Sequence, residues 1–262
     1  MKADPAFEFD GEKYKKASKH QKEWGTRLIK EFSFRGDEKI LDLGCGDGVL
    51  TAILADAVPN GYVTGIDASK GMIEEAIKLK RQNLNFLVMD INHLDETMAY
   101  DLIFSNAALH WVKNHAVLLQ SCKSALKQGG IIRFNFAGKG NCSNFFNIVK
   151  KTMEKDQFKN SFSGFVWPWY MPDILEYKKL MDTTDFKNVD IWEEKLDTYF
   201  ENEIALANWI KQPSIVPFLA CLDENTGKRF SDLVINKTVE ATKQNDGRFL
   251  VVFNRINIYA KK

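Results

Sequence analysis

Apolar and polar positions alternate in a regular order over the first half of the chain. A short apolar strand, Ile40–Leu43, precedes a glycine-rich turn, and apolar residues then recur at helical spacing over Val49–Val58. A second strand follows at Tyr62–Asp67, and Ser69 is a suitable N-cap for the next helix. We expect the inward face of that helix to consist of Met72, Ile73, Ala76 and Ile77.

The β-α pattern continues beyond this helix. Further strands are predicted over Asn85–Asp90, Tyr100–Asn106 and Ile131–Phe136, with a helix over Val112–Leu126 that Gly129-Gly130 ends. Strands that alternate with helices form a parallel sheet covered on both faces, because right-handed crossovers place helices on each side. Ligands of such sheets bind at the carboxyl ends of the strands.

After Ala137 the alternation stops, and the chain becomes helical and aromatic. A sixth strand is predicted around Val189–Trp192, helices over Glu201–Lys243 and a closing strand over Arg248–Tyr259. The expected fold is an α/β, Rossmann-like, doubly wound, mostly parallel seven-stranded sheet with helical cap insertions. The expected divisions are N-terminal lid helices at 1–34, a cofactor-binding core at 35–137, an aromatic helical cap at 138–185, and the last two strands with a helical insertion at 186–262.

Composition narrows the class of partner. The chain has 262 residues, 45% of them hydrophobic, and 36 Lys and Arg against 35 Asp and Glu. A net charge of +1 provides no broad positive field for a nucleic-acid backbone, so we expect no nucleic-acid partner. The lysines near the N-terminus are interpreted as a solvated helix face: Lys13, Lys15, Lys16, Lys19 and Lys22.

Cysteine usage and the N-terminus bear on the compartment. Cys45, Cys122, Cys142 and Cys221 show neither a C-x-x-C pair nor metal-ligand spacing, which indicates reduced thiols and no metal site. The first residues lack the apolar core of a signal peptide, and no stretch approaches the ~20 apolar residues of a membrane span. We therefore expect a cytoplasmic protein without a membrane partner.

The glycine-rich turn contains the most specific motif of the chain. Dinucleotide-binding folds use G-x-G-x-x-G, but here the third glycine comes one residue early and Val49 takes the later position. NAD and FAD are therefore disfavoured. The spacing Asp42-x-Gly44-x-Gly46-x-Gly48 resembles the first motif of class I S-adenosylmethionine-dependent methyltransferases, which implies S-adenosylmethionine as cofactor and S-adenosylhomocysteine as product.

Polar side chains end the neighbouring strands. Asp67 lies 19 residues after Gly48, where an acidic side chain can accept both ribose hydroxyls, although an Asp also commonly caps such a turn. Asp90 is expected to reach the adenine amino group, with the Ile91 amide facing the ring. Asn106 ends the fourth strand, where loop carbonyls could hold the ammonium of the cofactor, and a simple turn asparagine is the other interpretation.

The loop after Asn106 continues Ala107-Ala108-Leu109-His110-Trp111. It lacks the Asn-Pro-Pro-Tyr sequence common in enzymes that methylate adenine N6 or glutamine, so those reactions have little support. Trp111 is a candidate wall of the methyl-transfer pocket, and His110 a candidate donor or base. A core anchor and a merely hydrogen-bonded histidine are the alternatives.

Beyond the cofactor motif, the chain resembles trans-aconitate methyltransferases and the related juvenile hormone acid methyltransferases. The resemblance includes the Asn106–Trp111 loop, Trp209-Ile210, Pro217-Phe218-Leu219 and Gly247–Leu250, whereas Lys211-Gln212-Pro213 replaces a Gly-Thr turn usual in the aconitate type. It implies cofactor contacts from Tyr14, Asp42, Gly44, Cys45, Gly46, Asp67, Ala68, Met72, Asp90, Ile91, Asn106 and Ala107, and catalytic roles for Gln21, His110 and Trp111.

The resemblance implies a small-molecule substrate and carboxyl O-methylation of a small organic or fatty acid. A carboxylate is ionised at neutral pH, so no general base is needed. Gln21 would donate to the acid, and an exposed helical glutamine is the other interpretation. Trp167, Trp169 and Tyr170 are candidate walls, and core packing of the cap is the alternative. Arg27, Arg133 and Arg255 are equivalent candidates for its cationic partner. The alternatives are N- or C-methylation of another metabolite, RNA modification, and a non-catalytic binding protein that keeps the cofactor fold. A monomer or weak dimer is expected.

Overall fold

The structure, a computed structural model, describes residue 8 and residues 19–262 and divides into two compact units. Within the described residues, the first unit contains the chain up to Lys139, Trp169–Glu194 and Arg255–Lys262, and the second contains Gly140–Pro168 and Lys195–Asn254. These divisions differ from the expected ones, because residues 169–185 belong to the first unit and not to the cap.

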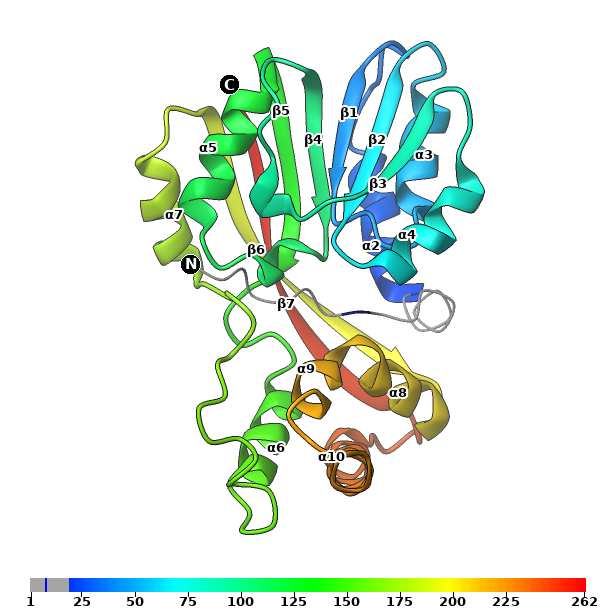
Figure 1. Cartoon of the computed structure of the whole chain (residues 1–262), viewed down its shortest axis with the longest axis vertical. Helices are drawn as coiled ribbons and strands as arrows, with labels where there is room; N and C mark the ends of the chain where they lie inside the picture. The colour runs from blue at the N-terminus through cyan, green and yellow to red at the C-terminus, as the bar shows by residue number, and fades with distance from the viewer. Residues whose placement is uncertain (1–7, 9–18) are drawn as a thin grey trace. The chain divides into compact units, whose positions relative to one another are not determined.

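The described residues form one seven-stranded sheet in the order β3-β2-β1-β4-β5-β7-β6 (Figure 1). The first five strands run parallel to one another, and β7 is antiparallel to β5. This confirms the predicted mostly parallel Rossmann-like sheet. The strands are β1 (Lys39–Leu43), β2 (Tyr62–Asp67), β3 (Leu84–Val88), β4 (Tyr100–Asn106), β5 (Leu126–Ala137), β6 (Lys187–Phe200) and β7 (Phe249–Lys261).

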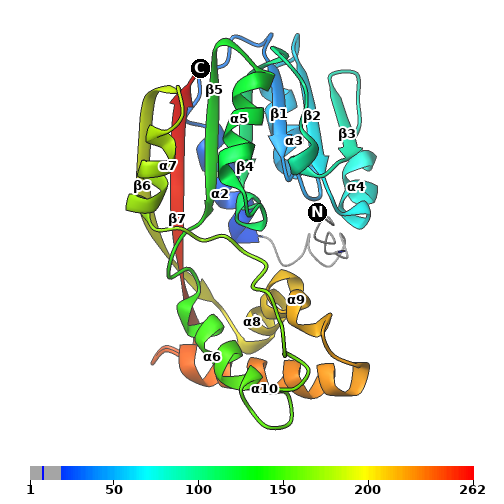
Figure 2. The ribbon, with the colours of Figure 1, turned by 60° about the vertical axis from the view of Figure 1, so that its left-hand side comes forward.

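Side-chain alternation along the strands builds a core on each face of the sheet in the first unit. Ile40 packs in one apolar cluster, while Leu41 and Leu43 pack in the other. The helices of the first cluster are α2 (Lys19–Ile29), α3 (Val49–Ala57) and α4 (Lys70–Ala76), and those of the second are α5 (His115–Ala125) and α7 (Ile174–Asp182). Figure 2 shows α5 in front of the sheet and α2 behind it.

Three short turns of 3-10 helix complete the first unit: η1 (Ile77–Leu79), η2 (Ile91–His93) and η3 (Leu109–Trp111). Ser69 caps α4 as predicted, since its hydroxyl accepts the Met72 amide at 3.3 Å. The predicted inward position of Ile77 is wrong, because α4 gives way to η1 there and the side chain is half exposed.

Two element boundaries also differ from the expectations. The helix predicted over Val112–Leu126 ends at Ala125, one residue early, but the strand predicted to begin at Ile131 begins at Leu126. Gly129-Gly130 therefore lie inside β5, where Gly129 adopts φ +75°. The sixth strand, predicted only over Val189–Trp192, runs from Lys187 to Phe200. Its outer residues are largely charged and exposed, so their hydrophobic pattern is too weak to indicate a strand.

The second unit is helical with an aromatic core. Aromatic rings from its helices and loops pack edge to face. Phe158 packs in this way on Phe230, and Phe145 on Trp209. Its helices are α6 (Ser143–Met153), α8 (Glu203–Trp209), the π-helical turn η4 (Ile210–Ser214), α9 (Val216–Leu219) and α10 (Glu224–Thr242). Gln212 interrupts η4 with the extended angles φ −147° and ψ 109°, in the tripeptide that departs from the aconitate type.

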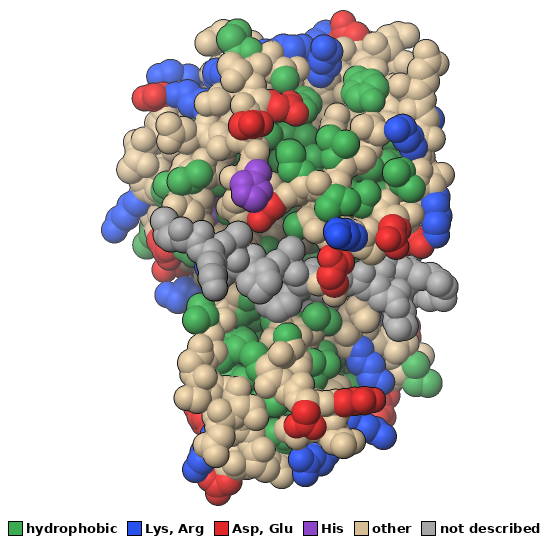
Figure 3. Space-filling view, in the orientation of Figure 1, with side chains coloured by type: hydrophobic (Ala, Val, Ile, Leu, Met, Phe, Trp, Pro, Cys, Tyr) green, Lys and Arg blue, Asp and Glu red, His purple; other side chains and the backbone are tan. Residues whose placement is uncertain are grey.

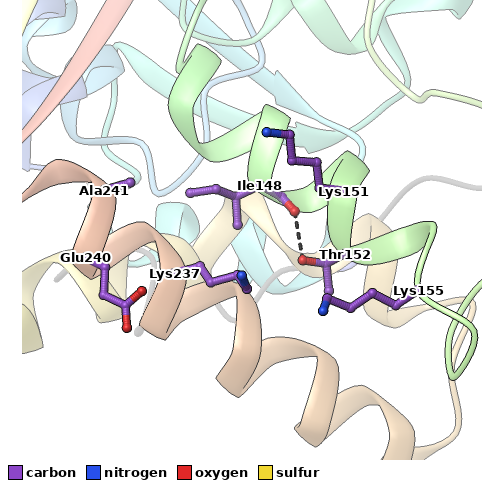
Figure 4. A pocket seen from close by; sticks show the side chains of 7 residues that line it. All are labelled: Ile148, Lys151, Thr152, Lys155, Lys237, Glu240 and Ala241. Atoms are coloured by element: carbon purple, nitrogen blue, oxygen red, sulfur yellow. Dashed lines mark hydrogen bonds between the residues drawn. The ribbon is translucent and has the colours of Figure 1, made fainter.

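A shallow pocket of the second unit lies between α6 and α10 (Figure 4). Lys151, Lys155, Lys237 and Glu240 line it together with apolar atoms, and the Thr152 hydroxyl donates to the Ile148 carbonyl of its own helix. Mixed charges and an internally satisfied hydroxyl are typical of a solvated groove.

The described surface carries both signs of charge. On the face shown in Figure 3, blue and red side chains are interspersed. Among residue 8 and residues 19–262, no helix has the combination of length and apolar character needed to cross a membrane.

Candidate active site

The loops after β1 and β4 meet at the carboxyl edge of the sheet in the first unit. β1 pairs with both β2 and β4, so the strand order reverses here, which is where parallel α/β sheets bind ligands. The contact is close, since a Cβ on Gly44 would lie 2.2 Å from the Ala108 Cβ. Gly44 also has φ +72°, so only glycine fits both requirements.

Backbone amides tie the glycine turn to the end of β2. Gly44 and Cys45 both donate to the Ile66 carbonyl, at 2.8 and 2.9 Å. The Gly46 amide donates to Asp67 Oδ2 at 3.0 Å, and the Ser69 amide donates to Asp67 Oδ1 at 2.9 Å. The Asp67 carboxylate is therefore turned toward the glycine turn and held there by two donors.

Gly46 faces open space. It has φ +55°, and a Cβ placed on it would meet no atom of the described residues within 4 Å. This is bare main chain beside a fixed carboxylate, the arrangement that a nucleoside ligand needs in order to lie against backbone.

Buried acids surround this turn. Asp42 accepts the Thr51 hydroxyl at 2.7 Å, and burial raises its pKa to about 7, with the Thr51 bond opposing and the Asp67 charge adding to the shift. Burial likewise raises the pKa of Asp67, against its backbone hydrogen bonds. Burial and the neighbouring carboxylates raise the pKa of Cys45 well above its usual value, so this thiol is not nucleophilic. Cationic groups of a ligand would favour the ionised acids.

The other predicted cofactor residues lie along the same edge. Asp90 caps η2, and its Oδ1 accepts both the amide and the side-chain nitrogen of Asn92 at 2.9 Å. The Ile91 side chain approaches Gly44, 3.9 Å from the position of an added Cβ. Ala68 follows Asp67 in the chain, and Met72 is buried in α4.

Helix α2 packs against these loops. Asn106 Nδ2 donates to the Gln21 carbonyl at 2.9 Å, and Lys22 Nζ lies 2.7 Å from Asp47 Oδ2. Lys22, predicted to lie on a solvated helix face, instead pairs with the buried Asp47, and this pairing joins α2 to the glycine turn. Tyr14, the other predicted lid residue, lies outside the described residues.

His110 and Trp111 follow in η3. The Trp111 ring lies 5.8 Å from His110 and 5.1 Å from Trp169, so two of the predicted aromatic walls are adjacent. Tyr170 instead packs on His115 in the first unit, and Trp167 packs on Phe146 in the second. Burial lowers the pKa of His110 to about 3, and the charges of Arg255 and His115 act in the same direction. His110 is therefore a neutral imidazole at physiological pH.

Asn135 connects the loop after β4 to β7, a role that the sequence analysis did not assign. Its carbonyl accepts the Ala107 amide at 2.7 Å, and the same residue accepts Arg255 at its side chain and its carbonyl. No local motif indicates this, because the contact depends on the antiparallel register that sets Asn135 opposite Asn257.

Three buried polar atoms of this edge, Gln21 Oε1, Asn106 Oδ1 and His110 Nδ1, have no hydrogen-bond partner among the residues described. A buried polar group without a partner costs about 1–3 kcal/mol, so such atoms together mark a place where a ligand supplies the partners. With the open Gly46 and the Asp67 carboxylate, this set fits S-adenosylmethionine: acids for its hydroxyl, amino and cationic groups, and bare backbone beneath it.

Comparison with known proteins agrees with this geometry. A family model described as "Methyltransferase domain" matches residues 35–203. The chain is 27% identical over 239 residues to trans-aconitate 2-methyltransferase from Enterobacter sp., covering 90% of this chain and 91% of the relative. It is 24% identical over 268 residues to that of Rhodopseudomonas palustris, covering 97% and 99%.

Solved structures share the fold at low identity. Phosphoethanolamine N-methyltransferase 2 of Haemonchus contortus, in complex with S-adenosyl-L-methionine, matches with a TM-score of 0.61 and 19% identity, covering 96% of this chain and 56% of that one. The YcgJ protein of Bacillus subtilis matches with a TM-score of 0.60 and 16% identity, covering 93% and 98%. The family model spans more than half of the chain, and we conclude that this chain belongs to the methyltransferase-domain family and is an S-adenosylmethionine-dependent methyltransferase.

Proposed function

We propose that this enzyme methylates a carboxylate of a small organic acid to give the methyl ester. The curated relatives that cover most of the chain are named for a reaction on trans-aconitate, an acid. The proposal includes the predicted cofactor-binding residues at the carboxyl edge, with Gln21, His110 and Trp111 on the acceptor side.

The observation that carries this proposal is the state of His110. An efficient general base has a pKa near the operating pH, whereas the pKa of His110 is lowered to about 3 by burial and by nearby positive charge. An amine, a phenol or a carbon acid must lose a proton during methylation, but a carboxylate, with a reference pKa of about 4, is already ionised at neutral pH. A neutral His110 therefore suits an acceptor that needs no base.

S-adenosylmethionine, when bound, supplies an electrophilic methyl group on a sulfonium. With Asp67 and the bare backbone at Gly46 holding the cofactor, a carboxylate oxygen would take this methyl group as the carbon–sulfur bond breaks, and the bonding electron pair would stay on sulfur. No proton moves, and the products are the ester and S-adenosylhomocysteine.

The protein contributes alignment and exclusion of water. Alignment of reacting groups at about 3–3.5 Å can supply about 7–11 kcal/mol of the barrier. His110 Nδ1, which has no partner among the described residues, would donate to the acid as an N–H, while Trp111 and Trp169, whose rings lie 5.1 Å apart, form an apolar wall. Opposite charges cancel during the transfer, so a site with little water favours it.

The test is transfer of a labelled methyl group from S-adenosylmethionine to a panel of mono-, di- and tricarboxylic acids, fatty acids, amines and phenols. We expect label only in acids, as an alkali-labile ester, and none in the matched primary amides. Gly46→Asn is the control, because a Cβ at this position meets no described atom within 4 Å, asparagine tolerates the left-handed backbone at φ +55°, and its side chain would occupy the space expected for the cofactor. Base-stable label, or transfer to amines or phenols alone, would overturn the proposal.

A further inference from the structure

His115 of α5, to which the sequence analysis assigned no role, connects α7 to the loop after β4. We call this loop, residues 107–111, the acceptor loop. The Nε2 atom of His115 lies 2.9 Å from the Leu109 carbonyl oxygen, and its Nδ1 atom lies 2.9 Å from the Tyr177 hydroxyl. All three residues are buried, so water does not compete for these hydrogen bonds.

The direction of both hydrogen bonds follows from their chemistry. A carbonyl oxygen only accepts, so the proton of the ring must be on Nε2. Burial lowers the pKa of His115 to about 4, so the ring is neutral at physiological pH and its Nδ1 atom carries no proton. The Tyr177 hydroxyl therefore donates to Nδ1, and Nε2 donates to the Leu109 carbonyl. Together these bonds fix the plane and the tautomer of the His115 ring.

The two peptide units on either side of His110 are held by residues outside the acceptor loop. The Leu109 carbonyl belongs to the peptide unit that leads into His110, and it accepts His115. The His110 carbonyl belongs to the next peptide unit, and it accepts the Tyr170 amide at 2.8 Å. The Tyr170 and His115 rings are 4.9 Å apart, so the two supports are in contact with each other.

The acceptor loop has little regular structure of its own. Its helical part, η3, is a single turn of three residues. Ala107, which precedes that turn, has the left-handed angle φ +59°, which is costly for a residue other than glycine. A short loop in such a conformation keeps its shape only when the surrounding residues impose it.

We propose that Tyr177 and His115 form a positioning pair that fixes the peptide unit between Leu109 and His110 and thereby sets where His110 and Trp111 meet the acceptor. The inference rests on the proposed function in placing this loop on the acceptor side. Neither residue of the pair reacts. Their effect on the rate arises because a misplacement of about 1 Å in reacting groups can cost about 100-fold.

The first test compares two substitutions of His115. In His115→Gln, the amide nitrogen is as many bonds from Cβ as Nε2 is, so it can still donate to the Leu109 carbonyl. In His115→Asn, the amide corresponds to Nδ1 and is too short to reach that oxygen. We expect the kcat of His115→Asn to fall about 10- to 100-fold and that of His115→Gln to stay within about 3-fold of the wild type. Cofactor affinity by calorimetry should change less than about 3-fold in both.

The second test removes the hydroxyl of Tyr177. Tyr177→Phe keeps the packing of the ring, and we expect kcat to fall about 3- to 10-fold because His115 is oriented less tightly. Tyr100→Phe is the matched control, since Tyr100 belongs to the same apolar cluster and its hydroxyl bonds to Glu96. That variant should lose stability without a change in kcat. In the wild type, ¹⁵N NMR at pH 7 should show His115 as the Nε2–H tautomer.

Equal kcat values for His115→Asn and the wild type, at a temperature where both are folded, overturn this inference. So does an equal loss in the Gln and Asn variants, which would indicate packing alone, or an Nδ1–H tautomer. If His115→Asn does not fold, Tyr177→Phe against Tyr100→Phe decides. If the wild type methylates no acid, the proposed function fails separately, and the same variants are compared on the amine or phenol that it does methylate.

Discussion

The middle of the β5–β7 pairing and the carboxyl edge of the same sheet treat buried charge differently. In the middle, Arg133 is surrounded by partners: Glu31 at two atoms, Asn257 Oδ1 at 3.2 Å, and the Trp192 ring 4.8 Å from its guanidinium carbon. At the edge, burial shifts the pKa of Asp42 and of His110 toward the neutral form. The neighbouring charges, Asp67 beside Asp42 and Arg255 beside His110, act in the same direction.

The difference separates a structural arrangement from one prepared for a ligand. A buried charge that the fold itself compensates contributes to a fixed packing, and its removal disturbs folding. At the edge, burial favours the neutral forms of the titratable groups, and nearby polar atoms have no described partner. A bound ligand would supply both the missing charge and the missing hydrogen-bond partners.

The largest effect is expected from Arg133→Met. The variant removes the bidentate pair with Glu31, whose own side chain is 44% exposed and can be solvated once alone. Asn257 Oδ1 still accepts the hydrogen bond that Asn135 Nδ2 donates at 2.8 Å. We expect unfolding in urea to show a loss of about 2–4 kcal/mol, because a buried, hydrogen-bonded charge pair is broken.

KM and kcat of Arg133→Met should match the wild type at a temperature where both are folded. The control Arg27→Gln, which removes an exposed pair, should lose less than about 1 kcal/mol. A raised KM in Arg133→Met without a loss of stability would instead assign Arg133 to substrate binding.

Asp42→Asn is expected to have an intermediate effect that depends on pH. The folded-state pKa of Asp42 is raised to about 7 from an ordinary 3.8, so between these values the folded protein holds a proton that the unfolded chain has released. This contribution to stability is fully present below pH 3.8 and is lost as the pH rises through 7.

The free energy of unfolding of the wild type, measured in urea from pH 4 to 8, should therefore fall relative to Asp42→Asn, by at most about 1.4 kcal/mol per pH unit. Asn keeps an oxygen for the Thr51 hydroxyl, so the variant is nearly isosteric. Saturating S-adenosylmethionine, being cationic, should reduce this slope by favouring the ionised acid. Parallel curves for the two proteins would show that Asp42 is ionised in the fold.

The smallest effect is expected from His110→Gln. Since its pKa is near 3, the imidazole is neutral across the range of assay, and Gln retains a hydrogen-bonding group at this place. We expect kcat to change less than about 3-fold between pH 6 and 8, against the 10²–10⁴-fold that removal of a general base costs.

The decisive measurement is the pH–rate profile of the methyl transfer. A profile of the wild type with a limb near neutral pH that disappears in His110→Gln would show a base at work and would favour N- or C-methylation.

In Arg255→Gln the pKa of His110 should rise, since one of the charges that lower it is removed, and an NMR titration of the ring would detect this.

Local physics explains what could be predicted from the sequence. The alternation of strands and helices, the glycine spacing of Gly44, Gly46 and Gly48, and the cap at Ser69 depend on neighbours within a few residues, and the strands appear where expected. The long β6 and the glycines inside β5 could not be predicted, because those strands are specified by their pairing partners more than by their own pattern.

By itself, the sequence determined that a strand, a glycine turn and a helix come in this order, with carboxylates at the ends of the following strands, since each is encoded over a short stretch of chain. Only the tertiary structure decided which of three arginines lies beside His110. That choice follows from the register of β7 against β5, which sets Arg255 opposite Ala137 and Asn257 opposite Asn135, and from α2, which brings Glu31 to Arg133. Charge compensation and burial depend on residues about 100 positions apart, and no local pattern contains them.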